Sequence, residues 1–270
     1  DVTDQFGNVA TGKASLVVTK RPVTLVSGDA SKVYDGTALT EHKVSVEDGS
    51  LASGEEFGYD FFGFQTSVGS SKNTFAATPG NGGTKVENYD IAYRYGTLTV
   101  SAQSINPDDP IPGAYAGVKV NAPSDVVYDA REHKWIPVVT GKDGNKLVKD
   151  HDYTVTYDTD DFVNVKVVNV TIAGMGSYTG TGVKAYEITK APLTVNAGSA
   201  SKVYDGEALT AGATIEGLVG GENATAQTQG SQTEVGSSAN TVSGITWDTA
   251  KEGNYYIAAQ NDGTLTVTPK

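Results

Sequence analysis

Cysteine is absent from this 270-residue sequence, and histidine is rare, with His42, His133 and His151 as the full set. Without cysteine there is no disulfide framework and no thiol chemistry. A histidine-based active site repeated along the chain is also excluded, because the last third of the sequence has no histidine. We therefore predict that the chain is not an enzyme.

Long apolar runs and positive charge are scarce as well. No apolar run approaches the ~20 residues with which a helix crosses a membrane, so we predict no membrane insertion by this segment. The 20 basic and 32 acidic side chains give a net charge of -12, which repels phosphate backbones. Nucleic acid is therefore not an expected partner. Neither a signal segment nor a wall-sorting tail is present, and we expect an internal fragment of a longer protein.

The residues that are plentiful favour β-structure. Glycine (32) and tyrosine (14) are abundant, and apolar residues alternate with polar ones at period two rather than at helical spacing. Turn dipeptides such as Asp35-Gly36 and Asp205-Gly206 separate the alternating stretches. About seven short strands in roughly 80 residues predict an all-β chain of small immunoglobulin-like β-sandwich modules in an extended array. β-Grasp-like modules are the alternative.

An internal repeat defines the domain organisation. Residues 21–40 match residues 191–210 at 13 of 20 positions, and residues 67–74 and 87–100 have counterparts at the same spacing in the last third of the chain. The offset between copies falls from 170 to 167 and 166 residues and then returns to 167, as loop variation produces. Repetition at this period indicates modules that contact mainly their neighbours.

The predicted boundaries follow from this repeat. A divergent unit lies between the two copies, and a segment with three prolines, which suits an extended spacer, precedes it. The N-terminal segment ends in SLVVTK before Arg21, as the divergent unit ends in AYEITK before Ala191. The prediction is 1–20 as the closing strands of a preceding repeat, 21–100 as the first repeat, 101–112 as a linker, 113–190 as the middle repeat and 191–270 as the third repeat.

The sequences SKVYDG-x-ALT and GTLTV, present in both full copies, resemble the MBG/YDG-type repeats of bacterial cell-surface proteins. The middle repeat is similar to related repeats, although Ala130 replaces the glycine after Tyr128-Asp129. The resemblance implies an extracellular location, with attachment to the cell wall through a region outside this sequence, and it brings no catalytic residue.

Three functional hypotheses follow. The first is a stalk or spacer in an adhesin that projects a binding region away from the cell, with neighbouring repeats as partners. The second is a repeat that itself binds host glycan, mucin or matrix protein. The third is an accessory region of a carbohydrate-active enzyme whose catalytic domain lies elsewhere in the same protein.

The Tyr-Asp-Gly triplets are predicted to be structural. Asp-Gly supplies a tight turn, and each tyrosine buries its ring while its hydroxyl finds a local backbone partner. Tyr89, Tyr178 and Tyr255 are expected to act like the tyrosine corner of sandwich domains. A ligand site of tyrosine and aspartate is the alternative. The triplet residues are Tyr34, Asp35 and Gly36; Tyr128 and Asp129; and Tyr204, Asp205 and Gly206.

An aromatic stretch distinguishes the first repeat from the third. The candidate ligand-binding residues Phe57, Tyr59, Phe61, Phe62 and Phe64 align with small or polar residues of the third repeat. Alternation along a strand places the first three on one face and the last two on the other. If the counterparts of Phe62 and Phe64 are exposed, these two form an outward apolar patch for a partner or glycan. The alternative is a larger core in the first repeat.

Acidic residues gather in the middle repeat. Asp158, Asp160 and Asp161 form an oxygen-rich group of the kind that binds calcium, without the spacing of an EF-hand. We expect either a calcium site that stiffens the array or solvated turns, and no other cofactor.

Overall fold

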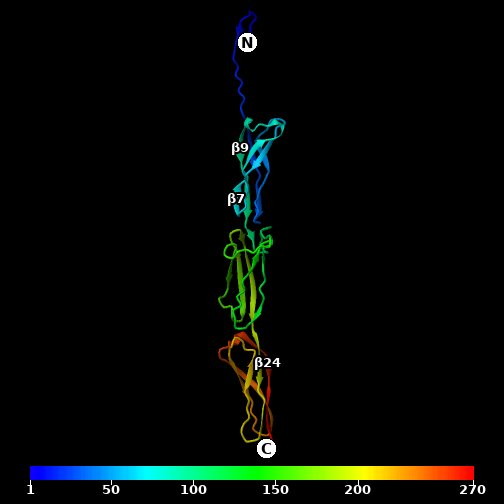
Figure 1. The fold of residues 1–270 in the computed structure, drawn as a ribbon, viewed down its shortest axis with the longest axis vertical. Helices are drawn as coiled ribbons and strands as arrows, with labels where there is room; N and C mark the ends of the chain where they lie inside the picture. The colour runs from blue at the N-terminus through cyan, green and yellow to red at the C-terminus, as the bar shows by residue number, and fades with distance from the viewer. The chain divides into compact units, whose positions relative to one another are not determined.

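The computed structural model describes residues 1–270, with Gly82 described by its backbone alone. Its regular elements are β-strands and short 3-10 helices (Figure 1), which confirms the all-β prediction. None of the helices in this part of the chain has the length and apolar character that a membrane crossing requires. The chain forms two units, of which the first holds residues 1–103 and the second holds most of the middle repeat and all of the third.

The first repeat contains three small sheets. In spatial order their strands are β5 (Val44–Gly49), β3 (Arg21–Ser27) and β9 (Tyr89–Arg94); β4 (Ala30–Val33), β10 (Thr97–Ser101) and β7 (Gly69–Lys72); and β6 (Phe57–Phe61) with β8 (Phe75–Pro79). β3 runs parallel to β9, and β10 runs parallel to β4, whereas the other pairs are antiparallel. The 3-10 helices η1 (Asn81–Gly83) and η2 (Val86–Asn88) lead into β9.

The core of the first repeat follows from alternation along its strands. Val23 and Leu25 of β3 point inward and pack with Phe57, Phe75 and Tyr89. Burying each such side chain contributes roughly 1.5–3 kcal/mol relative to leaving it exposed. This repeat therefore has a core of its own.

The third repeat repeats this topology. Its strands are, in spatial order, β21 (Ala213–Glu216), β19 (Ala191–Ala197) and β24 (Tyr255–Asn261); and β20 (Ala200–Val203), β25 (Gly263–Thr268), β23 (Gly236–Trp247) and β22 (Ala224–Gln229). The single strand β23 corresponds to β7 and β8 together. A β-bulge where β19 pairs with β24, between Leu193 and Thr194, accounts for the extra residue in the second copy.

The middle repeat has a different arrangement. Its strands are β13 (Val126–Val127), β18 (Thr181–Thr189), β16 (Lys166–Gly174) and β15 (Tyr153–Tyr157), in that order; β12 (Lys119–Val120) with β14 (Val139–Thr140); and β11 (Gln103–Ser104) with β17 (Tyr178–Thr179). Val168, Val170 and Ile172 alternate inward along β16 and are fully buried. β18 leads through Lys190 directly into β19 of the third repeat.

Short paired strands also occur in the two segments that were predicted to lie outside the repeats. The predicted linker 101–112 is partly regular, because β11 pairs with β17, and Gln103, Ser104 and Ile105 are buried. In the N-terminal segment, β1 (Val2–Thr3) pairs with β2 (Val9–Ala10), whereas residues 11–20 are not in a strand. The three prolines of the linker predicted an extended spacer, whereas the residues before the prolines pair with β17.

A buried asparagine is shared by the two full copies. Nδ2 of Asn73 donates to the carbonyls of Gly28 and Glu41, and Nδ2 of Asn240 donates to the carbonyls of Gly198 and Ala211. Both side chains are fully buried, so these bonds are made away from water. The asparagine therefore fixes the turns after β3 and β19 in the same way.

Candidate functional site

The aspartate of each Tyr-Asp-Gly triplet closes a turn. Its Oδ1 accepts a hydrogen bond from the backbone N–H two residues ahead, at 2.9 Å from Thr37 to Asp35, 2.9 Å from Arg131 to Asp129 and 3.0 Å from Glu207 to Asp205. The next residue has positive φ, 80° at Gly36, 64° at Ala130 and 87° at Gly206. The lysine three residues before Asp35 also bonds its carboxylate, and these contacts hold the pKa of Asp35 below its usual range. The tight turn predicted at these triplets is therefore present in the structure.

The tyrosine of the middle triplet does not bond its local backbone as predicted. Tyr128 is only 3% exposed, and its hydroxyl donates to Oε1 of Glu222 in the third repeat at 2.8 Å. Its ring packs edge-on against Tyr255, with centroids 5.5 Å apart. Tyr34 and Tyr204 are half-buried. The middle triplet therefore forms part of a joint between repeats rather than only a core.

Glu222 receives a second phenol at this joint. The Tyr255 hydroxyl donates to Oε2 of Glu222 at 2.5 Å and accepts from the Val219 N–H at 3.2 Å. Burial, followed by the hydrogen bond to Glu222, raises the pKa of Tyr255 to about 12. Burial and the same carboxylate raise the pKa of Tyr128 as well. Both phenols therefore stay protonated donors at neutral pH, and the carboxylate is their shared acceptor.

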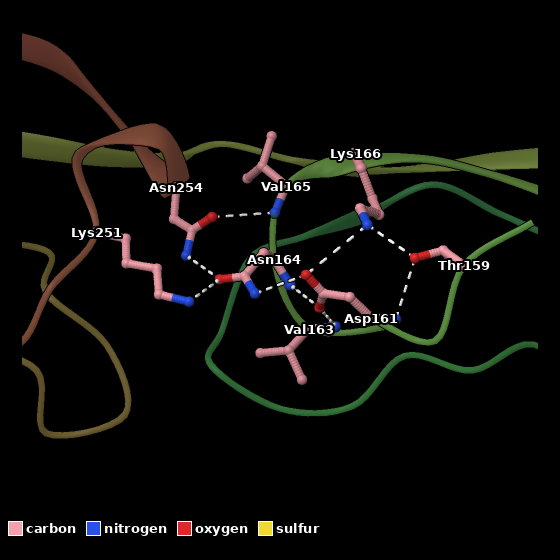
Figure 2. A network of polar contacts seen from close by, with 8 residues as sticks. All are labelled: Thr159, Asp161, Val163, Asn164, Val165, Lys166, Lys251 and Asn254. Atoms are coloured by element: carbon pink, nitrogen blue, oxygen red, sulfur yellow. Dashed lines mark hydrogen bonds and ion pairs between the residues drawn. The ribbon is translucent and has the colours of Figure 1, made fainter.

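A second set of bonds crosses the joint through Asn254, which is also 3% exposed. Figure 2 shows its side chain facing the loop before β16. Oδ1 of Asn254 accepts from the Val165 N–H at 3.0 Å, and Nδ2 donates to Oδ1 of Asn164 at 2.9 Å. Lys251 donates to the same Asn164 oxygen at 3.3 Å. Asn254 ends the 3-10 helix η3 (Glu252–Asn254), which places it immediately before Tyr255.

The partner loop in the middle repeat is held in shape by Asp161. Its carboxylate accepts from the N–H groups of Val163 and Asn164, both at 3.0 Å, and from Nδ2 of Asn164 at 2.8 Å (Figure 2). Lys166 lies 3.8 Å away. These bonds, those to Asn164 first, lower the pKa of Asp161 to about 2. Asp161 therefore positions Asn164 to meet Asn254.

The structure does not bring the predicted calcium ligands together. Asp161 serves the loop just described, and both carboxylate oxygens of Asp158 accept hydrogen bonds from Asn169. Asp160 is exposed. Among the residues that the structure describes, no group of three or more histidine, aspartate or glutamate side chains is placed to hold a metal ion. The carboxylates of Asp158 and Asp161 are thus oriented by protein donors.

The first repeat carries the same tyrosine and glutamate. The hydroxyl of Tyr89 donates to Glu55 and accepts from the Ala52 N–H at 2.9 Å, as Tyr255 does with Glu222 and Val219. Asn88, the counterpart of Asn254, is exposed. Glu222, Asn254 and Asn164 were not identified from the sequence. The signal that was available is the pairing of a repeated glutamate with a repeated Asn-Tyr pair in both copies.

The aromatic stretch is divided between core and surface as the alternation predicted. Phe57 is buried in the core of the first repeat, and Tyr59 and Phe61 pack partly against that core. Phe62 and Phe64 are 62% and 63% exposed. Their counterparts Gln229 and Ser231 are exposed as well. The outward apolar patch is therefore Phe62 and Phe64.

The observations define an all-β chain with two copies of one fold and an intervening divergent unit. Residues 188–263 match the YDG domain family. The third repeat is therefore a YDG domain, as the resemblance of its Tyr204-Asp205-Gly206 segment indicated.

Solved structures of low similarity were also found. The I9-I11 tandem from titin is 10% identical, with 94% of this chain and 98% of that chain covered and a TM-score of 0.22. The extracellular cadherin domains 3-6 of protocadherin gamma B2 are 11% identical, with 92% and 71% covered and a TM-score of 0.20. At these TM-scores neither likeness bears on the architecture. Among curated proteins no relative matches the chain.

Proposed function

We propose that this chain is a series of stalk repeats in a bacterial cell-surface adhesin, which projects a binding region away from the cell. The observation that carries the proposal is the joint formed by Tyr128, Glu222 and Asn254, in which consecutive repeats bond through the buried Tyr128 and Asn254 and the half-buried Glu222. A spacer needs such joints because flexible linkers between domains let the tip fall back toward the cell. Its role is mechanical, and no catalytic step is part of it.

The proposal includes the architecture and location of the repeats. Each full copy has inward alternation on two sets of strands, with Leu25 and Leu98 fully buried in one and Leu193 and Leu265 in the other. This supports small immunoglobulin-like sandwiches arranged in tandem. The YDG domain supports a place on the cell surface, with wall attachment through another region of the protein. Antibodies raised against the chain would then label intact cells, and labelling only after lysis would contradict this location.

Small-angle scattering of the 270-residue chain tests the stalk directly. The proposal predicts a particle with the cross-section of one repeat and a maximum dimension set by repeats placed end to end. A compact particle would refute it. The same curve with added calcium tests the acidic group at Asp158, Asp160 and Asp161, because a stiffening site changes the curve when calcium binds.

A second candidate function is favoured by the patch of Phe62 and Phe64. Two neighbouring phenylalanines that are each more than half exposed, at positions where the sibling repeat has exposed polar residues, form a surface for a host glycan, mucin or matrix protein. Binding of the chain to immobilised mucin, lost in a Phe62→Ser, Phe64→Ser double variant, supports this function. Gln229→Ser, which changes the counterpart of Phe62 in the third repeat, is the matched control. It tests whether the loss of mucin binding belongs to the first repeat. Equal mucin binding by the double variant would dismiss it.

A further inference from the structure

We propose that the first repeat has a docking surface for another β-module of the middle-repeat type, formed by Glu55, Asn88 and Tyr89 at the end where β3 begins. The inference rests on the proposed stalk function and names the partner that this end accepts. It starts from the joint within the second unit, where the middle repeat meets Glu222, Asn254 and Tyr255. The three docking residues are the counterparts of those three.

The polar groups of the surface are already arranged for docking. Glu55 accepts from the Tyr89 hydroxyl, and the Ala52 N–H donates to that hydroxyl at 2.9 Å. In the third repeat the matching carboxylate has one oxygen bonded to Tyr255 and the other to Tyr128 of the neighbouring module. A tyrosine at the Tyr128 position of a docked module would donate a hydrogen bond to the other carboxylate oxygen of Glu55 in the same way.

Asn88 shows the difference that docking makes. Asn254 is buried and uses both ends of its amide across the joint, whereas Asn88, which also ends a 3-10 helix before the corner tyrosine, is exposed. Identical local structure with opposite exposure indicates that burial at this position comes from the neighbouring module. The module that covers Asn88 must therefore present a backbone N–H and a side-chain amide oxygen, as Val165 and Asn164 do.

The segment before β3 supports the same occupant. Residues 15–20 (SLVVTK) align with residues 185–190 (AYEITK), which close the middle repeat and run into β19. In the middle repeat Tyr186 and Ile188 are 3% and 0% exposed, whereas Leu16 and Val18 at the matching positions are 91% and 89% exposed. The segment has the pattern of a closing strand without the sheet that would cover it.

Two residues near the docking surface of the first repeat differ from their counterparts at the joint in the third repeat. Arg21 replaces Ala191, and its Nη2 donates to Ser50 Oγ at 2.8 Å, which holds it against the neighbouring loop. Ser53 replaces Gly220, where a β-carbon would lie 2.4 Å from the Ala130 Cβ of the docked module. The docking test therefore uses two versions of the added module. One keeps Ala130, and the other has glycine there, which completes the Tyr-Asp-Gly triplet and removes the β-carbon that Ser53 would meet.

The test is a chain in which a second copy of residues 113–190 replaces residues 1–20, built with and without Ala130→Gly in that copy. With the added copy alone 15N-labelled by segmental ligation, amide exchange at its Val165 should be at least tenfold slower than in the same chain carrying Asn88→Ala. The thermal midpoint of the first repeat should fall by several degrees in that variant. In the original 270-residue chain Asn88→Ala should leave this midpoint unchanged.

The outcomes separate this inference from the stalk proposal. A second sample of each chain, in which the original middle repeat alone is 15N-labelled, gives the exchange rate of its own Val165. Protection there without protection in either added copy overturns the docking surface and leaves the stalk intact. Loss of protection in both places overturns the joint on which both proposals depend. An unchanged midpoint on Asn88→Ala in both extended chains also refutes the docking surface.

Discussion

Replacing Asn254 by alanine removes the side chain that links the middle and third repeats through its amide. The variant keeps the backbone of η3 and the ring of Tyr255, so it deletes hydrogen bonds without altering the core of the third repeat. Oδ1 of Asn254 accepts from Val165, and Nδ2 donates to Asn164 (Figure 2). We predict that the variant folds and that its two repeats separate more readily.

The expected magnitude follows from the groups left behind. Asn164 keeps its bond from Lys251, but the Val165 N–H loses its acceptor. A buried donor left without a partner costs about 1–3 kcal/mol, and a neutral hydrogen bond contributes about 0.5–1.5 kcal/mol. Water that enters the opened joint can accept from the Val165 N–H, which offsets part of this free-energy cost. We therefore predict a loss of about 2 kcal/mol, which corresponds to a roughly 30-fold increase in the opening equilibrium.

Amide hydrogen exchange at Val165 measures this opening, because exchange reports local separation without unfolding of the repeats. The rate should rise roughly 30-fold in Asn254→Ala. Asn88→Ala is the matched control, since it makes the same change at an exposed position of the same fold. It should leave exchange unchanged at Val165 and within the first repeat. An unaltered Val165 rate in Asn254→Ala, or an equal loss of stability in both variants, would refute the reasoning.

Further predictions concern the phenols, the loop and the cores. Tyr128→Phe keeps the ring but removes the bond to Glu222, and it should weaken the joint by about 1.5–3 kcal/mol in the same exchange assay, with Tyr204→Phe as control. Because the folded-state pKa of Tyr255 is raised, its stabilising effect is complete below pH ~10 and is lost as pH rises to about 12; an absorbance titration should show its late ionisation, and a normal titration would contradict it. Because the pKa of Asp161 is lowered to about 2, its effect on the loop is present above pH ~4 and is lost as pH falls through about 2, which the side-chain amide shift of Asn164 should follow; a shift with an ordinary aspartate midpoint would count against it. Leu25→Ala should cost about 2–5 kcal/mol and expose amides of the first repeat alone, whereas loss of protection in the third repeat too would disprove separate cores.

Features that depend on nearby residues were predictable from the sequence. Period-two alternation predicted strands, and along β3 and β19 it sends Leu25 and Leu193 into cores, because successive side chains of a strand point to opposite faces. The turn at Asp35 was equally predictable, since the hydrogen bond that closes it comes from Thr37, only two residues ahead. The split of the aromatic stretch, with Phe62 outward, followed from the same period of two.

Features that depend on a neighbouring module were not predictable from these patterns. Tyr128 bonds Glu222, which lies 94 residues away in the sequence, so its local pattern holds no sign of that partner. Asn88 and Asn254 occupy the same local structure, yet one is exposed and the other buried. The local pattern of the acidic group likewise did not reveal that the backbone N–H groups after Asp161 donate to its carboxylate. Spacing alone does not distinguish a metal ligand from such a turn.

Residual dipolar couplings of the 270-residue chain test the central claim that the joint holds the middle and third repeats together. Amides of β16 in the middle repeat and of β19 in the third should report one common alignment tensor, since Tyr128, Glu222 and Asn254 fix the two repeats to each other. The Asn254→Ala variant should show two different tensors. Two different tensors already in the unaltered chain would contradict the claim.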